Sequence, residues 1–117
     1  YQPDVWRGRS ADKKQGSEGE VDVNMSSYKS RMLGLVKHYN KLVEMGVAPE
    51  QARMVLPQSM MTEWYWSGSL YAFAKMCSLR LKPDAQYETR LVAEQIEDKM
   101  AKLFPESWTA LRAYDDT

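Results

Sequence analysis

Apolar residues recur every three or four positions between residues 23 and 45, which is the pattern of an amphipathic helix. Gly46 follows this stretch, at a position where helix ends favour glycine. Pro49 suits the first turn of a second, short helix, because proline needs no amide partner there. That helix should end before Pro57, since the residue before a proline avoids helical geometry. The first half of the chain therefore predicts a long helix followed by a short one.

Helical spacing returns in the second half of the chain. Over residues 70–81, the apolar side chains fall within one sector of a helix: Leu70, Phe73, Ala74, Cys77 and Leu81. A further helix is predicted over residues 84–103, where apolar side chains again share a face. Pro105 interrupts this pattern, and Trp108 indicates a last short helix after it.

Between these two halves, residues 60–67 alternate in a way that favours a strand. Met60, Thr62, Trp64 and Trp66 would lie on one side of it, and aromatic residues are enriched in strands. The predicted fold is therefore α+β and predominantly helical, with about four helices and one strand at about residues 60–67.

Residues 1–22 are polar and rich in glycine, serine and mixed charge, which is typical of a connector or loop. Trp6 is the side chain best able to anchor this segment. We therefore divide the chain into a connector or loop at residues 1–22 and the C-terminal part of a larger domain at residues 23–117, and we expect the whole to be a portion of a longer protein.

Composition limits the classes of function. The chain has 117 residues, enough for one domain or part of one. Its 16 basic and 16 acidic residues cancel, so no overall field attracts nucleic acid or an acidic membrane. Cys77 is the single cysteine, which excludes an internal disulfide and suits a reducing cytoplasm. No apolar run approaches the roughly 18 residues that span a bilayer. We expect a cytoplasmic protein with no membrane segment and no nucleic-acid partner.

Two arginines, Arg53 and Arg80, stand where a helix would favour apolar residues. A guanidinium cannot lose its charge, so near a core it needs an anionic or strongly polar partner. For Arg80 the alternatives are a structural pair with Glu88 or a contact with a bound anion or polarised carbonyl. For Arg53 they are a surface position, a structural ion pair, or a clamp on a phosphate, which suits the forked guanidinium.

Other residues give weaker signals. The turn at residues 67–69 offers backbone amides to an anion, but it lacks the further glycines and the lysine of a phosphate loop. Trp64 and Trp66 either stack on a flat ligand or belong to a core. Cys77, on an apolar face, is expected to pack rather than react. No catalytic acid–base pair and no metal-ligand cluster is evident in the sequence.

Residues 46–88 carry a characteristic order of motifs: ARMVLP, then TEW, a glycine turn, a helix ending in LRL, and AQYE. This order resembles the C-terminal half of the flavin-dependent thymidylate synthases, and the likeness continues more loosely to Leu103. The segments WSGSL and LRLKPDAQ look most like the bacteriophage members. The signature motif of that family, an arginine–histidine–arginine core followed by a serine and an arginine–tyrosine pair, is not present in these residues.

The resemblance implies that the intact protein makes thymidylate (dTMP) from deoxyuridylate (dUMP). In that family reduced FAD, regenerated by NADPH, relays the methylene of methylenetetrahydrofolate to C5 of the uracil, and each active site of a homotetramer draws on several subunits. Arg53 matches a position that binds dUMP, consistent with a phosphate clamp. Arg80 matches an arginine that contacts the uracil and favours its ionisation at N3, so it is the candidate catalytic residue. Without the signature half, these 117 residues alone are expected to be inactive.

The resemblance also implies flavin contacts at Ser69, Leu70, Tyr71 and Lys75. Other members can carry asparagine and arginine in the first of these segments, and asparagine where Lys75 stands. The side chains therefore depart from the family pattern, whereas contacts through the backbone would be unaffected.

Two other classes of function stay open. One is a non-enzymatic helical module that binds a nucleotide or a partner protein. The other is binding of single-stranded nucleic acid by Trp64 and Trp66 with nearby arginines, which the zero net charge disfavours.

Overall fold

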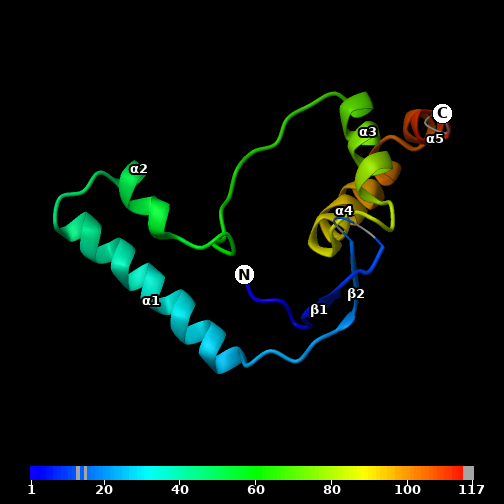
Figure 1. Ribbon diagram of the computed structural model, residues 1–117. Coiled ribbons are helices and arrows are strands. Elements are labelled where there is room, and N and C mark those ends of the chain that lie inside the picture. Colours follow the sequence, from blue (N-terminus) through cyan, green and yellow to red (C-terminus); the bar gives the residue numbers. More distant parts are fainter. Residues whose placement is uncertain (13, 15, 115–117) are drawn as a thin grey trace. The chain divides into compact units, whose positions relative to one another are not determined.

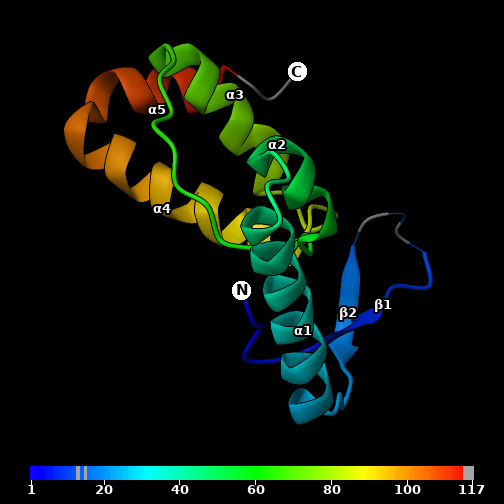
Figure 2. The same cartoon turned by 90° about the vertical axis from the view of Figure 1, so that its left-hand side faces the viewer.

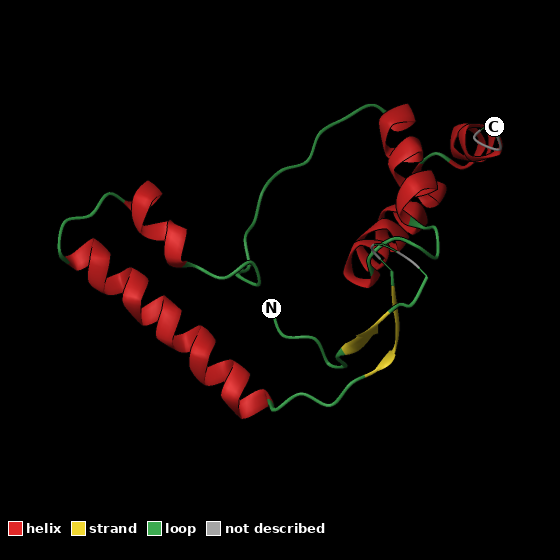
Figure 3. Ribbon diagram, in the orientation of Figure 1, coloured by secondary structure: helices red, strands yellow, loops and turns green. Residues whose placement is uncertain are grey.

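The structure is a computed structural model that describes residues 1–12, 14 and 16–114 (Figure 1). Its elements in chain order are β1 (Arg7–Arg9), β2 (Ser17–Glu20), α1 (Met25–Glu44), α2 (Pro49–Ala52), the 3₁₀ helix η1 (Arg53–Val55), α3 (Leu70–Arg80), α4 (Tyr87–Leu103) and α5 (Pro105–Ala113). Helices dominate these residues, and β1 pairs with β2 in a two-stranded sheet (Figure 3). The prediction of a predominantly helical α+β fold is confirmed.

The predicted helices are found where the apolar spacing placed them, with ends a few residues inside the predicted ranges. The estimate of about four helices is slightly low, because the described residues contain five α-helices, two of them short. Both short helices, α2 and α5, begin with proline, which needs no amide partner in the first turn.

The strand predicted at residues 60–67 is wrong. These residues form a loop with no hydrogen-bonded neighbour strand among the described residues. The strands lie instead within residues 1–22, the predicted connector. There Arg7 binds across the pair, with Nε donating to Ser17 Oγ at 2.7 Å and Nη2 donating to Ser17 O at 3.0 Å. Side-chain hydrogen bonds therefore help to stabilise this polar sheet. Its strands lack the alternation of apolar and polar residues from which a strand is predicted.

The chain forms two compact units, and each is described by itself. Unit 1 consists of Tyr1–Trp6 and Glu20–Trp64, and unit 2 of Arg7–Gly19 and Tyr65–Thr117. The proposed division at residue 22 stays a prediction.

In unit 1, α1 packs against α2 and η1. Asn24 begins α1 by accepting a hydrogen bond from Ser27 N at 3.0 Å. Gly46 follows its end with φ +89°, a conformation that glycine adopts without strain. Trp6 anchors the first residues, as expected, since its ring lies edge-on to Tyr28 at 5.0 Å between centroids. The side chains of α1 are all at least partly exposed, so unit 1 has a thin core.

Unit 2 contains the better-formed core, where α3, α4 and α5 pack together (Figure 2). The buried residues Ala74, Cys77 and Trp108 form one cluster in this core, and Ala85 and Ala93 are buried as well. Partly buried apolar side chains surround the cluster: Leu70, Phe73, Met76, Leu81, Ile96, Met100 and Leu111. The apolar sector predicted for residues 70–81 is therefore confirmed as the core face of α3.

Replacement of Trp108 by alanine should destabilise unit 2 by about 3–5 kcal/mol, because it leaves a large cavity in the core. Trp108 is 2% exposed, whereas Trp64 is 72% exposed and provides a matched control. Trp64→Ala should change stability by less than about 0.5 kcal/mol. Urea unfolding followed by far-ultraviolet circular dichroism measures both. Equal effects of the two substitutions would contradict the packing described for α5.

Candidate functional site

Arg80 is the last residue of α3, where its positive charge is favoured by the carbonyl end of the helix. It borders a pocket of about 380 Å³ that we name the Arg80 pocket. The lining residues come from the loop before α3, from α3 and from α4: Trp66, Met76, Arg80, Glu88, Thr89 and Val92. The pocket thus combines an aromatic and apolar wall with one cation and one carboxylate.

The aromatic wall of the Arg80 pocket is held in place by α3. The ring of Trp66 packs on Phe73, with centroids 5.2 Å apart and planes tilted by 56°. Phe73 in turn packs against the core of unit 2. Gly68 lies beside the same ring, since a Cβ added there would lie 3.4 Å from Phe73. The loop before α3 therefore packs closely on the first turns of the helix.

The structural alternative for Arg80 was an ion pair with Glu88. Both residues line the Arg80 pocket, but they make no ion pair or hydrogen bond with each other in the described part of the chain. The guanidinium of Arg80 has no hydrogen-bond partner among the described residues either. Both groups are therefore able to receive a ligand that offers an acceptor to Arg80 and a donor to Glu88.

Arg80 also lines a second pocket, of about 520 Å³. Its lining carries charges of both signs: Asp12, Lys14, Leu79, Arg80, Lys82, Asp84 and Ala85. The side chain of Arg80 therefore lies between an apolar pocket and a strongly polar one.

Arg53 lies in unit 1, at the start of η1, and is exposed. Its carbonyl accepts a hydrogen bond from Leu56 N at 3.0 Å, which fixes the turn before Pro57. No ion pair or side-chain hydrogen bond engages its guanidinium within the described residues. Unit 1 also has a largely apolar pocket of about 370 Å³ beside α1, but Arg53 does not line it. Arg53 and Arg80 thus belong to different units, and a shared site stays a prediction.

The four residues expected to contact flavin lie at the start of α3. The hydroxyl of Ser69 accepts a hydrogen bond from Ala72 N at 3.1 Å, so it caps the helix. Leu70 packs against the core. Tyr71 and Lys75 are exposed and four residues apart, so they share one face of α3. Ser69 and Leu70 therefore have structural roles in the helix, and a flavin contact at any of the four residues stays a prediction.

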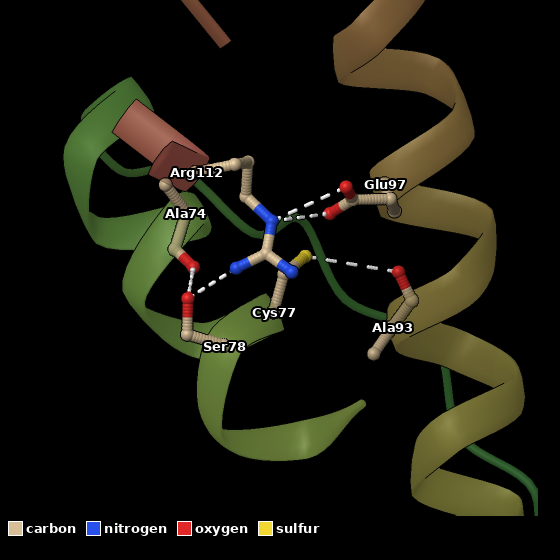
Figure 4. Close-up of polar contacts among 6 residues, drawn as sticks. All are labelled: Ala74, Cys77, Ser78, Ala93, Glu97 and Arg112. Carbon is tan, nitrogen blue, oxygen red and sulfur yellow. Dashed lines mark hydrogen bonds and ion pairs between the residues drawn. The ribbon is translucent and has the colours of Figure 1, made fainter. Parts of the chain in front are cut away.

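A polar network joins the three helices of unit 2, and sequence reasoning did not find it. Figure 4 shows the guanidinium of Arg112 between Glu97 and Ser78. Arg112 Nε lies 3.0 Å from Glu97 Oε2, Arg112 Nη1 donates to Ser78 Oγ, and Ser78 Oγ donates to Ala74 O at 3.1 Å. The sequence offered one indication of this network. Arg112 follows Trp108 by four residues, which places it near the apolar face of α5. This network has a structural role.

Cys77 lies beside this network and is fully buried, as predicted for a packing residue. Its Sγ donates a hydrogen bond to Ala93 O at 3.7 Å. Burial, followed by the charge of Glu97, raises the pKa of the Cys77 thiol from 9.0 to about 11. The thiol therefore stays protonated near neutral pH and is a poor nucleophile.

The residues that the structure describes contain no group of three or more His, Cys, Asp or Glu side chains able to hold a metal ion. None of the helices in this part of the chain is both long enough and apolar enough to cross a membrane.

Comparison with known proteins identifies the class of protein. The family model of the thymidylate synthase complementing protein matches residues 1–106, so the chain belongs to this family. No solved structure gives a significant match.

Curated relatives of this chain carry a more specific name. It is 34% identical over 116 residues to the flavin-dependent thymidylate synthase of Thermus thermophilus, covering 97% of this chain and 43% of the relative. It is 35% identical over 119 residues to that of Thermosipho melanesiensis, covering 93% and 49%. It is 37% identical over 99 residues to that of Kosmotoga olearia, covering 78% of this chain and 41% of the relative. The chain spans less than half the length of these relatives.

Alkylation of Cys77 by iodoacetamide at pH 8 should be at least about 100-fold slower in the folded chain than in denaturant. A pKa raised from 9.0 to about 11 lowers the thiolate fraction at pH 8 by about this factor, and burial slows the reaction further. Between pH 9.0 and about 11 the thiol ionises in the unfolded chain but stays protonated in the folded chain. The free energy of unfolding should therefore fall as the pH rises through this window. Mass spectrometry measures the labelling, and similar rates in both states would show that Cys77 is accessible.

Proposed function

We propose that this chain supplies the nucleotide-binding arginines of a flavin-dependent thymidylate synthase. The intact enzyme converts dUMP to dTMP by reductive methylation, with methylenetetrahydrofolate, FAD and NADPH. The observation that carries this proposal is the Arg80 pocket, in which a guanidinium with no partner among the described residues borders an aromatic wall. Family membership supports the same conclusion.

The charges of the Arg80 pocket favour the uracil ring over the phosphate of dUMP. Arg80 and Glu88 together give the pocket no net charge, and Glu88 would repel a phosphate. A uracil ring offers both acceptors and a donor, and its flat face suits the indole of Trp66. Arg80 would then stabilise the negative charge that develops on the ring as C5 becomes nucleophilic. Since arginine keeps its proton, this stabilising charge is permanent.

Arg53 is assigned to the phosphate of dUMP. Its forked guanidinium suits a phosphate, and no carboxylate among the described residues neutralises it.

Tyr71 and Lys75 are assigned to the flavin. An exposed phenol can stack on a flat ring system, and an exposed ammonium can approach an anionic group of the cofactor. Bound flavin would supply the redox chemistry of methylene transfer. The phenol and ammonium on one face of α3 would orient it.

The chain alone is proposed to be inactive, because it spans less than half the length of its relatives. The remaining catalytic groups would come from the rest of the enzyme, in a homotetramer whose sites combine several subunits. Binding of neither dUMP nor flavin by the full-length protein would instead favour a non-enzymatic helical module.

In the full-length enzyme, Arg80→Lys should lower kcat by at least about 100-fold, because an ammonium cannot reproduce a planar, forked contact. Arg31→Lys, on the exposed surface of α1, is the matched control and should keep parental turnover. Formation of dTMP measures both variants. Near-parental turnover of Arg80→Lys would show that Arg80 has only a structural role.

The role of Arg53 is tested by varying the ligand as well as the residue. Arg53→Ala should weaken binding of dUMP by about 10- to 100-fold, the loss expected for charge-assisted hydrogen bonds to a phosphate. Deoxyuridine lacks the phosphate, so its affinity should change by less than about two-fold. Isothermal titration of the full-length enzyme measures both ligands, with Arg31→Ala as control. An equal loss for both ligands would contradict the phosphate clamp.

A further inference from the structure

The side chain of Arg112 joins α5 to both of the helices that line the Arg80 pocket. Its Nε donates to Glu97 Oε1 of α4 at 3.2 Å, and its Nη1 donates to Ser78 Oγ of α3 (Figure 4). The side chains of Arg112 and Glu97 are 25% and 30% exposed, so water screens this ion pair only in part. The family model matches residues 1–106 and does not reach Arg112, so that match gives this arginine no role.

The hydrogen bonds of Ser78 have only one possible direction. A guanidinium can only donate, so Ser78 Oγ accepts from Arg112. The single proton of the hydroxyl is then donated to Ala74 O, at 3.1 Å. Because the hydroxyl both donates and accepts, its orientation is fixed, and it holds α3 to α5.

Ser78 lies in the last turn of α3, the turn that carries Arg80. The ends of helices leave backbone groups without partners inside the helix, and they fray. Among the described residues, side-chain hydrogen bonds attach this turn to both neighbouring helices. Cys77 Sγ donates to Ala93 O of α4, and Arg112 Nη1 of α5 donates to Ser78 Oγ. Arg80 therefore extends from a turn that is anchored directly before it.

A purely structural role is the alternative for Arg112. Partly buried ion pairs often stabilise a protein no more than apolar side chains of similar size do. The exposed side chain of Arg80, in contrast, forms no ion pair within the described part of the chain. The place of its guanidinium therefore depends on the backbone of the turn from which it extends. A shift of about 1 Å in a group that acts on the substrate can lower the rate by about 100-fold.

We propose that Arg112 is a positioning residue for Arg80. By holding Ser78, Arg112 keeps the last turn of α3 closed, and the closed turn keeps the guanidinium of Arg80 at the Arg80 pocket. Arg112 acts in this way without touching the substrate. The inference rests on the proposed role of Arg80 in binding dUMP.

Ser78→Ala tests this link with the least disturbance. It removes the hydroxyl but keeps the ion pair between Arg112 and Glu97, and alanine favours a helix more than serine does. In the full-length enzyme this variant should keep the parental unfolding temperature but lower kcat for dTMP formation by at least about ten-fold.

Thr109→Ala is the matched control. The hydroxyl of Thr109 also donates to the carbonyl four residues before it, Pro105 O, at 2.7 Å. In the described part of the chain this hydroxyl has no partner on another helix. The kcat of Thr109→Ala should therefore stay within about two-fold of the parental value.

The double variant Arg112→Met/Glu97→Met removes the same link from the side of α5. Both charges are removed together, so neither is left partly buried without its partner. This variant should also lower kcat by at least about ten-fold. Circular dichroism sets the assay temperature, at which every variant is folded.

A double-mutant cycle connects the effect to Arg80. In an Arg80→Lys background, Ser78→Ala should lower kcat by less than about two-fold further, because the contact that depends on Ser78 is already lost. A purely structural role would instead give the same loss in both backgrounds.

Amide hydrogen exchange adds a measurement that does not involve dUMP. The amide of Leu81 closes the last turn of α3 by donating to Cys77 O at 2.9 Å. In the full-length Ser78→Ala variant, peptides that contain Leu81 should exchange at least about five-fold faster than in the parent.

Parental kcat in both Ser78→Ala and the Arg112→Met/Glu97→Met variant would overturn the inference. Equal losses in the two backgrounds of the cycle, or unchanged exchange at Leu81, would also overturn it. If Arg80→Lys lowers turnover and Ser78→Ala does not, the proposed function stands and only the positioning role fails. If Arg80→Lys keeps parental turnover, the proposed function fails, and the positioning role fails with it.

Discussion

The close approach of α3 and α4 determines the geometry on which the Arg80 pocket depends. Small side chains make it possible, because Cys77 and Ala93 meet with both side chains fully buried. A larger side chain at either position would separate the helices. With this spacing, the last turn of α3 faces the first turns of α4, and Arg80 shares a pocket with Glu88. The packing of α3 thus places the exposed side chain of Arg80 at the pocket, and no ion pair among the described residues occupies its charge.

The sequence was informative wherever structure depends on near neighbours. The helix of residues 70–81 follows from apolar spacing, and its core face appears as expected. Strands depend on residues far away in the chain, so the alternation at residues 60–67 could not reveal that the described residues offer no neighbouring strand. The reverse error occurred at β1 and β2, where a polar segment became a sheet through contacts such as that between Arg7 and Ser17.

In the candidate site, too, the sequence predicted local features but not contacts between distant residues. Arg80 stood out in the sequence because a charged residue ended an apolar helix. The sequence did not predict that Glu88, Thr89 and Val92 line the same pocket as Arg80. These residues meet through the packing of α4 on α3, which no local sequence pattern indicates. Spacing alone also left open whether Arg80 and Glu88 form a structural pair, and the structure shows no such pair among the described residues. Arg53 was found by the same reasoning, and its place relative to Arg80 stays a prediction.

The order in which the chain enters its two units has a consequence for engineering and for evolution. The backbone passes between them after Trp6, after Gly19 and after Trp64, so each unit is assembled from two separate stretches. Tyr1 and Ser59, for instance, meet through a hydrogen bond although most of unit 1 lies between them in sequence. No single cut can therefore release either unit intact. A recombination event that exchanged one of them between relatives would need several matched junctions, which favours inheritance of the whole segment as one block.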